Sequence, residues 1–370
     1  MMLALLIILD ILLIVCFAFI PYVTRKTELF GVSIPSEKTS EPELMKLRAS
    51  YRNQLLAGGV VLIAVSVALQ FLGNWESFGT VIIWLVVVFL YLAAAFLLYL
   101  PKHRQMKSIK HAQAWDTPVT PAVIVADTTP ATKDVVSPLW LLLLPLITAL
   151  TVLGIVAIWP QVPQQVPMHF DLAGSVDSYA AKGLDAVLPL LLTQIFLAMT
   201  IALCFFVVRH SKRQIDASNP KTSTKQSIRF RRANSIFLLA IGIATQLMIA
   251  FMQIMTLLGI QNFWAVMTPV IILMVVILVG MYIMMFRIGQ GGSRIKESET
   301  RASNNVNVDD DRYWKLGQFY FNPNDPALFV EKRFGVGFTS NFARPLTWVL
   351  ITGFIVLAIA LLAVTLWLIK

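Results

Sequence analysis

Residues that could bind a ligand or move a proton are concentrated in one loop after a long apolar run. Residues 159–174 read WPQVPQQVPMHFDLAG, in which three prolines hold the chain extended and Gly174 favours a tight turn. His169 and Asp171 alternate on an extended strand, so they face the same side and could share a cation or a proton. Asp177 follows closely. The alternative is that these side chains only hydrogen-bond the turn and shape the loop.

A second feature is the carboxylate of Asp10, which lies inside an apolar run. A charge near the bilayer centre costs about 2.5–3.5 kcal/mol, so such a group is normally protonated, paired or beside water. At about 1.5 Å per helical residue, the side chains at a comparable depth are Thr148, Thr151, Gln194, Gln246 and Gln253. This predicts a polar layer in the membrane. Alternatively, the amides are ordinary interhelical hydrogen-bond partners and Asp10 is protonated.

The sequence contains none of the common catalytic or cofactor motifs. There is no GxxxxGK[ST] phosphate loop, no HExxH pair and no GxSxG elbow. No two of the four histidines have metal-ligand spacing, and Cys16 and Cys204 lie in separate apolar runs without a CxxC pair. We therefore expect no enzyme activity, no metal and no cofactor.

The elements that must position these residues are membrane-spanning helices. Of the 370 residues, 57% are hydrophobic and only 14% are charged, whereas about a quarter are charged in a soluble domain. A bilayer core of about 30 Å requires about 20 apolar residues in a helix. Eight segments reach that length: 2–22, 54–73, 79–100, 138–159, 184–208, 233–259, 264–286 and 346–369. The predicted fold is an all-α integral membrane protein with eight transmembrane helices.

The distribution of Lys and Arg predicts the orientation of this bundle. Of the 30 cations, 28 lie in four connections that we call the cation-rich connections, and Lys182 lies in an alternate one. The positive-inside rule therefore predicts a cell-membrane protein with both termini extracellular and these connections in the cytoplasm. The net charge of +10 reflects this topology and an affinity for anionic lipid headgroups, so nucleic acid is not an expected partner. The cation-rich connections are 22–53, 101–137, 209–232 and 287–345.

The last cation-rich connection predicts a linker and a folded module. Residues 289–311 are rich in Gly, Ser, Asn and charge without an apolar period, which predicts a flexible linker. Residues 312–345 regain aromatics and turn signals, which favours a compact β-hairpin-like cytoplasmic module between helices 7 and 8. The polar residues singled out in it are Asn322, Asp325, Arg333, Gly337 and Asn341. The predicted regions are therefore 1–137, 138–208, 209–286, 287–345 and 346–370.

Three strings resemble families of membrane proteins. The string PQVPQQVPMHFDLAGSVD after an apolar helix resembles, over roughly 138–185, the domain of unknown function numbered 1648. That domain occurs in bacterial multi-pass membrane proteins, including SdpI-type bacteriocin immunity and signalling proteins. Residues 320–345 resemble a second domain of unknown function, numbered 5808, and the FGVSIP string at 30–35 looks like a signature of relatives. The resemblance implies a bacterial plasma-membrane protein and assigns no catalytic residue.

These observations support three functional hypotheses. The first is a non-enzymatic sensor or immunity-type protein that binds an extracellular peptide or envelope signal and reports to a cytoplasmic regulator. The second is a transporter or channel that uses Asp10, although the chain has no persuasive internal repeat and no matched pair of broken helices. The third, a membrane-embedded enzyme using His169 and Asp171, lacks a nucleophile or metal set.

Overall fold

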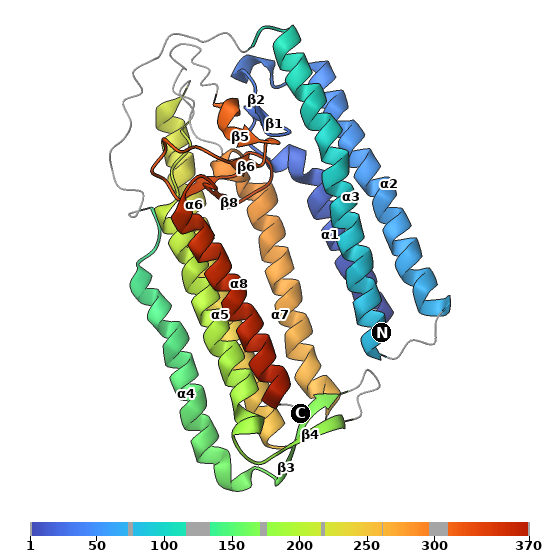
Figure 1. Ribbon diagram of the computed structural model, residues 1–370, viewed down its shortest axis with the longest axis vertical. Helices are drawn as coiled ribbons and strands as arrows, with labels where there is room; N and C mark the ends of the chain where they lie inside the picture. The colour runs from blue at the N-terminus through green and yellow to red at the C-terminus, as the bar shows by residue number, and fades with distance from the viewer. Residues whose placement is uncertain are drawn as a thin grey trace. The chain divides into compact units, whose positions relative to one another are not determined.

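The computed structural model describes residues 2–72, 77–115, 134–170, 176–215, 219–260, 262–295 and 310–368. Within these residues, eight helices are long and apolar enough to cross a membrane (Figure 1). This confirms the predicted fold class, and the chain is a multi-pass membrane protein. The helices are α1 (Met2–Val23), α2 (Pro42–Leu72), α3 (Ser77–Ala112), α4 (Leu143–Ile158), α5 (Leu184–His210), α6 (Pro220–Leu257), α7 (Phe263–Ile283) and α8 (Pro345–Leu368).

Short antiparallel β-hairpins occupy several connections in the described part of the chain. Two of them lie between α7 and α8, as the turn signals of residues 312–345 predict. Another follows α4 and contains the proline-rich string. The paired strands are β1 (Glu28–Leu29) with β2 (Val32–Ser33), β3 (Gln165–Phe170) with β4 (Val176–Ala181), β5 (Trp314–Lys315) with β6 (Phe319–Tyr320), and β7 (Phe329–Glu331) with β8 (Phe338–Ser340).

The chain divides into two compact units. Unit 1 consists of Met1–Ala131, Ser211–Phe230 and Tyr282–Arg344, and it contains α1, α2, α3 and the hairpins between α7 and α8. Unit 2 consists of Thr132–His210, Arg231–Met281 and Pro345–Lys370. It contains α4, α5, α8, most of α6 and α7, and the β3–β4 hairpin.

The core of unit 1 forms where one face of α2 meets α1 and α3. Leu44, Leu47, Tyr51 and Leu55 recur at helical spacing and are each less than 5% exposed, which is the pattern of a helix with one buried stripe. Gly59 extends this contact, because a Cβ there would meet the side chain of Ile14 in α1. The close approach of α1 and α2 therefore depends on a glycine.

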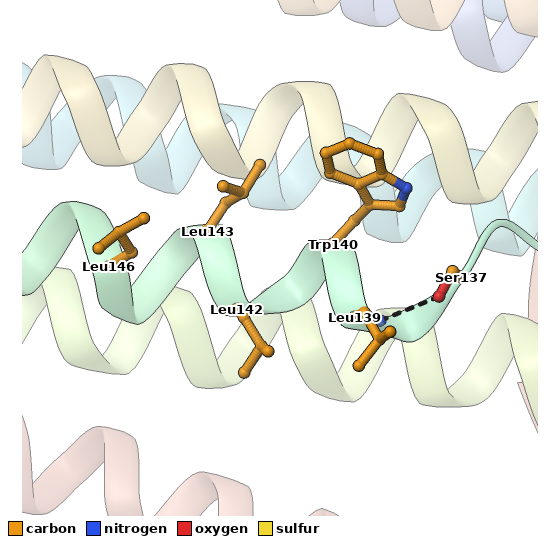
Figure 2. A pocket seen from close by; sticks show the side chains of 6 residues that line it. All are labelled: Ser137, Leu139, Trp140, Leu142, Leu143 and Leu146. Carbon is orange, nitrogen blue, oxygen red and sulfur yellow. Dashed lines mark hydrogen bonds between the residues drawn. The ribbon is translucent and has the colours of Figure 1, made fainter.

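Unit 2 has a smaller core and a long lipid-compatible surface. Ile155, Val162 and Val166 pack with Val187 and Leu257, which fixes the base of the β3–β4 hairpin against α5 and α6. At the start of α4, apolar side chains project around a shallow groove of about 410 Å³ (Figure 2). An apolar exposed surface of this kind suits a helix that faces acyl chains. The groove is lined by Ser137, Leu139, Trp140, Leu142, Leu143 and Leu146.

Candidate functional site

The candidate ligand-binding groups of the proline-rich loop fall outside the described structure, although most of its backbone is described. The predicted extended segment exists as β3, in which His169 pairs with Ser178 of β4, and Asp177 also lies in β4. Asp171 and Gly174 are outside the described residues, as are the side chains of His169 and Asp177. Their shared ligand site stays a prediction.

The base of this hairpin is held by Lys182. Its ammonium donates to the Val162 carbonyl at 2.9 Å and lies 5.3 Å from the centre of the Trp159 ring. The β3–β4 register is irregular between Pro167 and Phe170, so the strand that carries His169 is not a regular ladder. A charged residue and an aromatic residue thus fix the two ends of the loop, as expected for a hairpin at a membrane surface.

The polar residues predicted within the membrane form separate hydrogen-bonded groups. Asp10 is fully buried in unit 1, where its Oδ1 accepts a hydrogen bond from Trp84 Nε1 at 3.0 Å. In unit 2, Gln194 Nε2 donates to Thr151 Oγ1 at 3.2 Å, and Gln246 Nε2 donates to the Gln194 carbonyl at 2.8 Å. The structure therefore brings Gln194, Gln246 and Thr151 together and gives Asp10 a different partner.

Asn341 organises the folded module between α7 and α8. It is fully buried, and its Oδ1 accepts from the backbone N–H of Asn322 at 3.0 Å. Its Nδ2 donates to the carbonyls of Asn322, Asp325 and Ala327 at 2.9–3.2 Å. One amide therefore ties the Asn322–Ala327 turn to the end of β8. Buried backbone groups need such partners, so this turn depends on Asn341.

Asp325 links the same turn to the connection between α5 and α6. Its Oδ2 accepts from Lys212 Nζ and from the Tyr320 hydroxyl, both at 2.8 Å, while Oδ1 accepts from the Ala327 N–H. Burial alone would raise the pKa of Asp325, but these donors outweigh it and hold the pKa below its usual value. The carboxylate is therefore a fixed charge.

Gly337 and Gln290 fasten the β7–β8 hairpin to the segment after α7. Gln290 Oε1 accepts from the Gly337 N–H at 2.7 Å, and Gln290 Nε2 donates to the Gly337 carbonyl at 2.9 Å. Gly337 has a φ of +119°, a conformation that favours glycine. The sequence predicted a flexible linker over 289–311, and this is wrong for its first residues. Gln290, Gly291 and Gly292 are buried because three glycines permit a tight turn.

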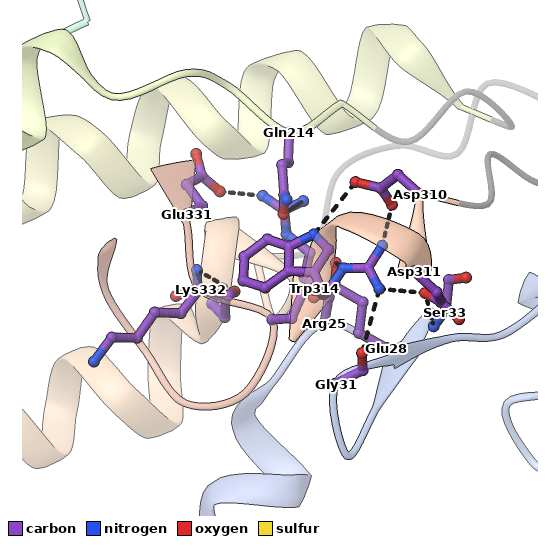
Figure 3. Close-up of polar contacts among 12 residues, drawn as sticks. Arg25, Glu28, Gly31, Ser33, Gln214, Asp310, Asp311, Trp314, Glu331 and Lys332 are labelled. Carbon is purple, nitrogen blue, oxygen red and sulfur yellow. Dashed lines mark hydrogen bonds and ion pairs between the residues drawn. The ribbon is translucent and has the colours of Figure 1, made fainter. Parts of the chain in front are cut away.

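A buried cluster of charged side chains surrounds Arg333, and Figure 3 shows its members Arg25, Glu28, Asp310, Asp311 and Glu331. The Arg333 side chain is only 2% exposed, pairs with Asp310 and Asp311, and lies 4.0 Å from Glu28. Lys110 of α3 also pairs with Asp311, at 2.7 Å. We use the name charged cluster for Arg25, Glu28, Lys110, Asp310, Asp311, Glu331 and Arg333.

The other half of the charged cluster joins α1 to α6 through Glu331. Arg25, two residues after α1, pairs with Glu331, whose side chain is fully buried. Ser227 of α6 donates to the other oxygen of Glu331 at 3.2 Å. Arg25 also donates to Gln214 Oε1 at 3.0 Å. Segments that are distant in the sequence thus meet at one carboxylate.

The charged cluster as named contains three cations and four carboxyl groups. In the described structure, Glu28 has the weakest pairing of the four, because it lies 4.0 Å from Arg333 and its buried Oε2 has no hydrogen-bond partner. Burial raises the pKa of Glu28 to about 7, although Arg25 and Arg333 oppose the shift. By contrast, Arg333 and Lys110 outweigh burial at Asp311 and keep its pKa low. Glu28 is therefore the group in the cluster that can change charge near neutral pH.

Beside the cluster, two tight turns meet against α3. Gly31 and Gly317 both have positive φ, and a Cβ on Gly31 would overlap the backbone of Gly317. Tyr99 Oη lies within hydrogen-bond distance of the carbonyls of Phe30 and Leu316, at 2.9 and 2.8 Å. Arg333 is the one residue of the charged cluster that the sequence analysis singles out. The FGVSIP string is the sequence feature that points to this region, because its Phe30 and Gly31 form the turn beside the cluster.

The described residues contain no group of three His, Cys, Asp or Glu side chains that could hold a metal ion. The charged cluster can couple the ends of α1 and α3 electrostatically through Arg25 and Lys110, and it can take up one proton at Glu28. The fold and this site define a multi-pass membrane protein whose cation-rich connections fold into a module held by buried charges.

Two family models match the chain and agree with both resemblances. Residues 137–193 match a domain of unknown function (DUF1648), which includes α4, the β3–β4 hairpin and the start of α5. Residues 323–348 match a family of unknown function (DUF5808), which includes Asp325, Arg333 and Asn341. No curated protein and no solved structure matches the chain significantly.

Proposed function

We propose that this protein is a non-enzymatic sensor or immunity-type protein of the bacterial cell membrane. It binds an extracellular peptide or envelope signal at the β3–β4 hairpin and reports through the module between α7 and α8 to a cytoplasmic regulator. Both termini are extracellular in this proposal. The support for this orientation is that 28 of 30 cations lie in the four cation-rich connections.

The observation that carries the proposal is the way the module is fastened. It bonds to Arg25 just after α1, to Lys110 within α3, to Ser227 within α6 and to Gln290 just after α7. A displacement of any of these helix ends therefore changes a charged or buried polar contact of the module. Packed elements of this kind respond to small shifts by changing between discrete arrangements.

The orientation is tested with reporter fusions. Alkaline phosphatase, which is active only outside the cytoplasm, should be active when fused after Gly174 and inactive when fused after Asn305. The opposite pattern would reject the proposed topology, and with it the cytoplasmic module.

The ligand-binding role of the outer hairpin is tested by complementation of a deletion strain. We expect the double variant His169→Ala, Asp171→Ala to lose function at normal membrane abundance, because it removes the two groups proposed to contact the signal. Ser178→Ala, a change in the paired strand, is the matched control and should complement. Full complementation by the double variant would place signal recognition elsewhere, whereas loss of abundance would assign these side chains a structural role.

A transporter or channel is the second candidate, and Asp10 is the observation that favours it. Its carboxyl group is fully buried in a membrane helix, and its Oδ2 has no hydrogen-bond partner among the described residues. A proton or cation relay must change its charge state. Asp10→Asn keeps the shape and the acceptor for Trp84, so a sensor should retain function with this change. If Asp10→Asn is present at wild-type abundance but fails to complement, the transporter hypothesis would be favoured over the sensor.

A further inference from the structure

Arg52 and Arg294 contact Tyr22 at the end of α1, and Arg48 lies one helical turn before Arg52; among the described residues, none of the three pairs with a carboxylate. Arg52 lies with its guanidinium 5.8 Å from the centre of the Tyr22 ring. Arg294 donates to the Tyr22 carbonyl at 2.9 Å, and Arg48 lies four residues before Arg52 on the same face of α2. These residues come from α2 and from the segment after α7, and all belong to unit 1.

None of the three guanidinium groups is neutralised in the part of the chain that the structure describes. Ion pairs of unit 1 use other cations, among them Arg25, Lys38, Lys110, Lys212 and Arg333. Arg48 Nε is buried and has no hydrogen-bond partner. Arg294 donates only to backbone carbonyls, those of Tyr22 and Phe286. Arg48 and Arg52 are partly buried, whereas Arg294 is exposed. Like charges this close together, two of them at reduced exposure to water, are costly unless an anion joins them.

The surroundings of these arginines are those of a membrane interface. Tyr22 is in the last turn of α1 and Phe286 follows α7 directly, so both lie where an apolar span ends. Phe19 packs against both rings, at centroid distances of 5.7 and 6.1 Å. Aromatic residues are typical of the headgroup level of a bilayer, and arginine is suited to phosphate because its N–H groups form a planar fork.

We propose that Arg48, Arg52 and Arg294 form a binding site for the phosphate group of an anionic phospholipid headgroup. The aromatic floor of Phe19, Tyr22 and Phe286 places the acyl chains toward the membrane. The guanidinium groups supply the positive charge, and Arg294 is already oriented by its two backbone carbonyls. The lipid would therefore join α1, α2 and the segment after α7, next to the elements that carry the charged cluster.

The test is lipid binding to the purified full chain in neutral detergent, measured by native mass spectrometry and by the thermal shift. The wild type should bind a short-chain phosphatidylglycerol and be stabilised by it, while phosphatidylcholine should bind at least about tenfold more weakly. The combined variant Arg48→Gln, Arg52→Gln, Arg294→Gln should lose the phosphatidylglycerol shift. The matched control is Lys46→Gln, an exposed cation on α2, which should keep it.

A smaller change keeps the test decisive if the combined variant does not fold. Arg294→Gln removes an exposed side chain that bonds only to carbonyls, and it should weaken phosphatidylglycerol binding by about tenfold, the loss expected for one charged hydrogen bond. A combined variant that folds and retains full phosphatidylglycerol binding would overturn the proposal. Equal stabilisation by inorganic phosphate would overturn the lipid assignment, and equal binding of phosphatidylcholine would overturn the requirement for an anionic lipid.

Discussion

The charged cluster of unit 1 and the contact between α5 and α6 in unit 2 bury polar side chains in opposite ways. Unit 1 buries full charges, which come from segments far apart in the sequence and neutralise one another around Arg333 and Glu331. In unit 2, the contact between α5 and α6 buries the neutral amides of Gln194, Gln246 and Gln253, which we call the amide seam. Each of these amides donates to a backbone carbonyl of the opposite helix. The charges are interdependent, whereas the amides are independent of one another. The difference indicates that unit 1 can respond as a whole to a local change.

The amide seam follows from regular helix packing. Gln194 lies opposite Gln246, and Gln253 Nε2 donates to the carbonyl of Val187 at 2.8 Å. Val187 and Gln194 are seven residues apart in α5, and their partners Gln253 and Gln246 are seven residues apart in α6 in the reverse order. The contacts therefore repeat as in an antiparallel coiled coil. Unit 2 also contains a buried ion pair, Arg231 with Asp134 at 3.5 Å, outside this amide seam. The seam itself needs no charge and no distant segment.

The largest expected effect is the loss of Arg333. Arg333→Leu leaves Asp310, Asp311 and Glu28 without their shared cation, and breaking a buried ion pair in this way costs about 3–5 kcal/mol. We expect the module to open far more often, which limited proteolysis at Lys315 would detect. Arg312→Leu is the control, because that side chain is exposed and lies over the Tyr313 ring. Equal proteolysis rates for Arg333→Leu and the wild type would contradict a module held by charge.

A second prediction concerns the pH dependence of the cluster. The folded protein holds a proton on Glu28 with a pKa of about 7, above the ordinary value of 4.5. The folded state therefore binds this proton more tightly than the unfolded state, and module stability falls as pH rises from about 5 to 7. The fall should be on the order of 2 kcal/mol.

Glu28→Gln is the variant that tests this titration. It removes the charge but keeps the shape, so the variant should match the wild type at pH 5 and be more stable than it at pH 8. Hydrogen exchange of β1, β2 and β7 across this range is the measurement. The carboxyl groups of Asp311 and Asp325 have lowered pKa values, so their contributions are lost only in stronger acid. A wild-type module whose protection factors, corrected for the base-catalysed intrinsic exchange rate, are the same at pH 5 and pH 8 would contradict the assignment.

The sequence predicted the helices and the position of the module because those features are local. An apolar run of about 20 residues specifies a membrane helix by itself, and Asn322-Pro-Asn-Asp-Pro specifies turns. The charged cluster was not predictable in the same way, since Arg25, Lys110 and Asp311 are brought together only by the fold. The linker prediction failed at Gln290 for a related reason. Its composition suits disorder, but a partner 47 residues away, Gly337, orders it.

Substitutions in the amide seam should have only small effects on stability. Gln246→Leu removes a hydrogen bond to the Gln194 carbonyl, and such bonds in bilayer helices average about 0.6 kcal/mol. Gln194→Leu should cost a similar amount. The side chain of Gln194 donates to the backbone carbonyl of Gln246 and to Thr151, and both acceptors survive when Gln246 becomes leucine.

The two seam substitutions should therefore be additive, with a coupling energy near zero in a double-mutant cycle. The same cycle on Arg333→Leu and Asp311→Leu should show strong coupling, because those two side chains bond to each other. Unfolding measured in bilayers by steric trapping would provide both cycles. Strong coupling between Gln194 and Gln246 would mean that their unpartnered Oε1 atoms share a bound water or ion. In that case unit 2 would contain an interdependent polar site as well.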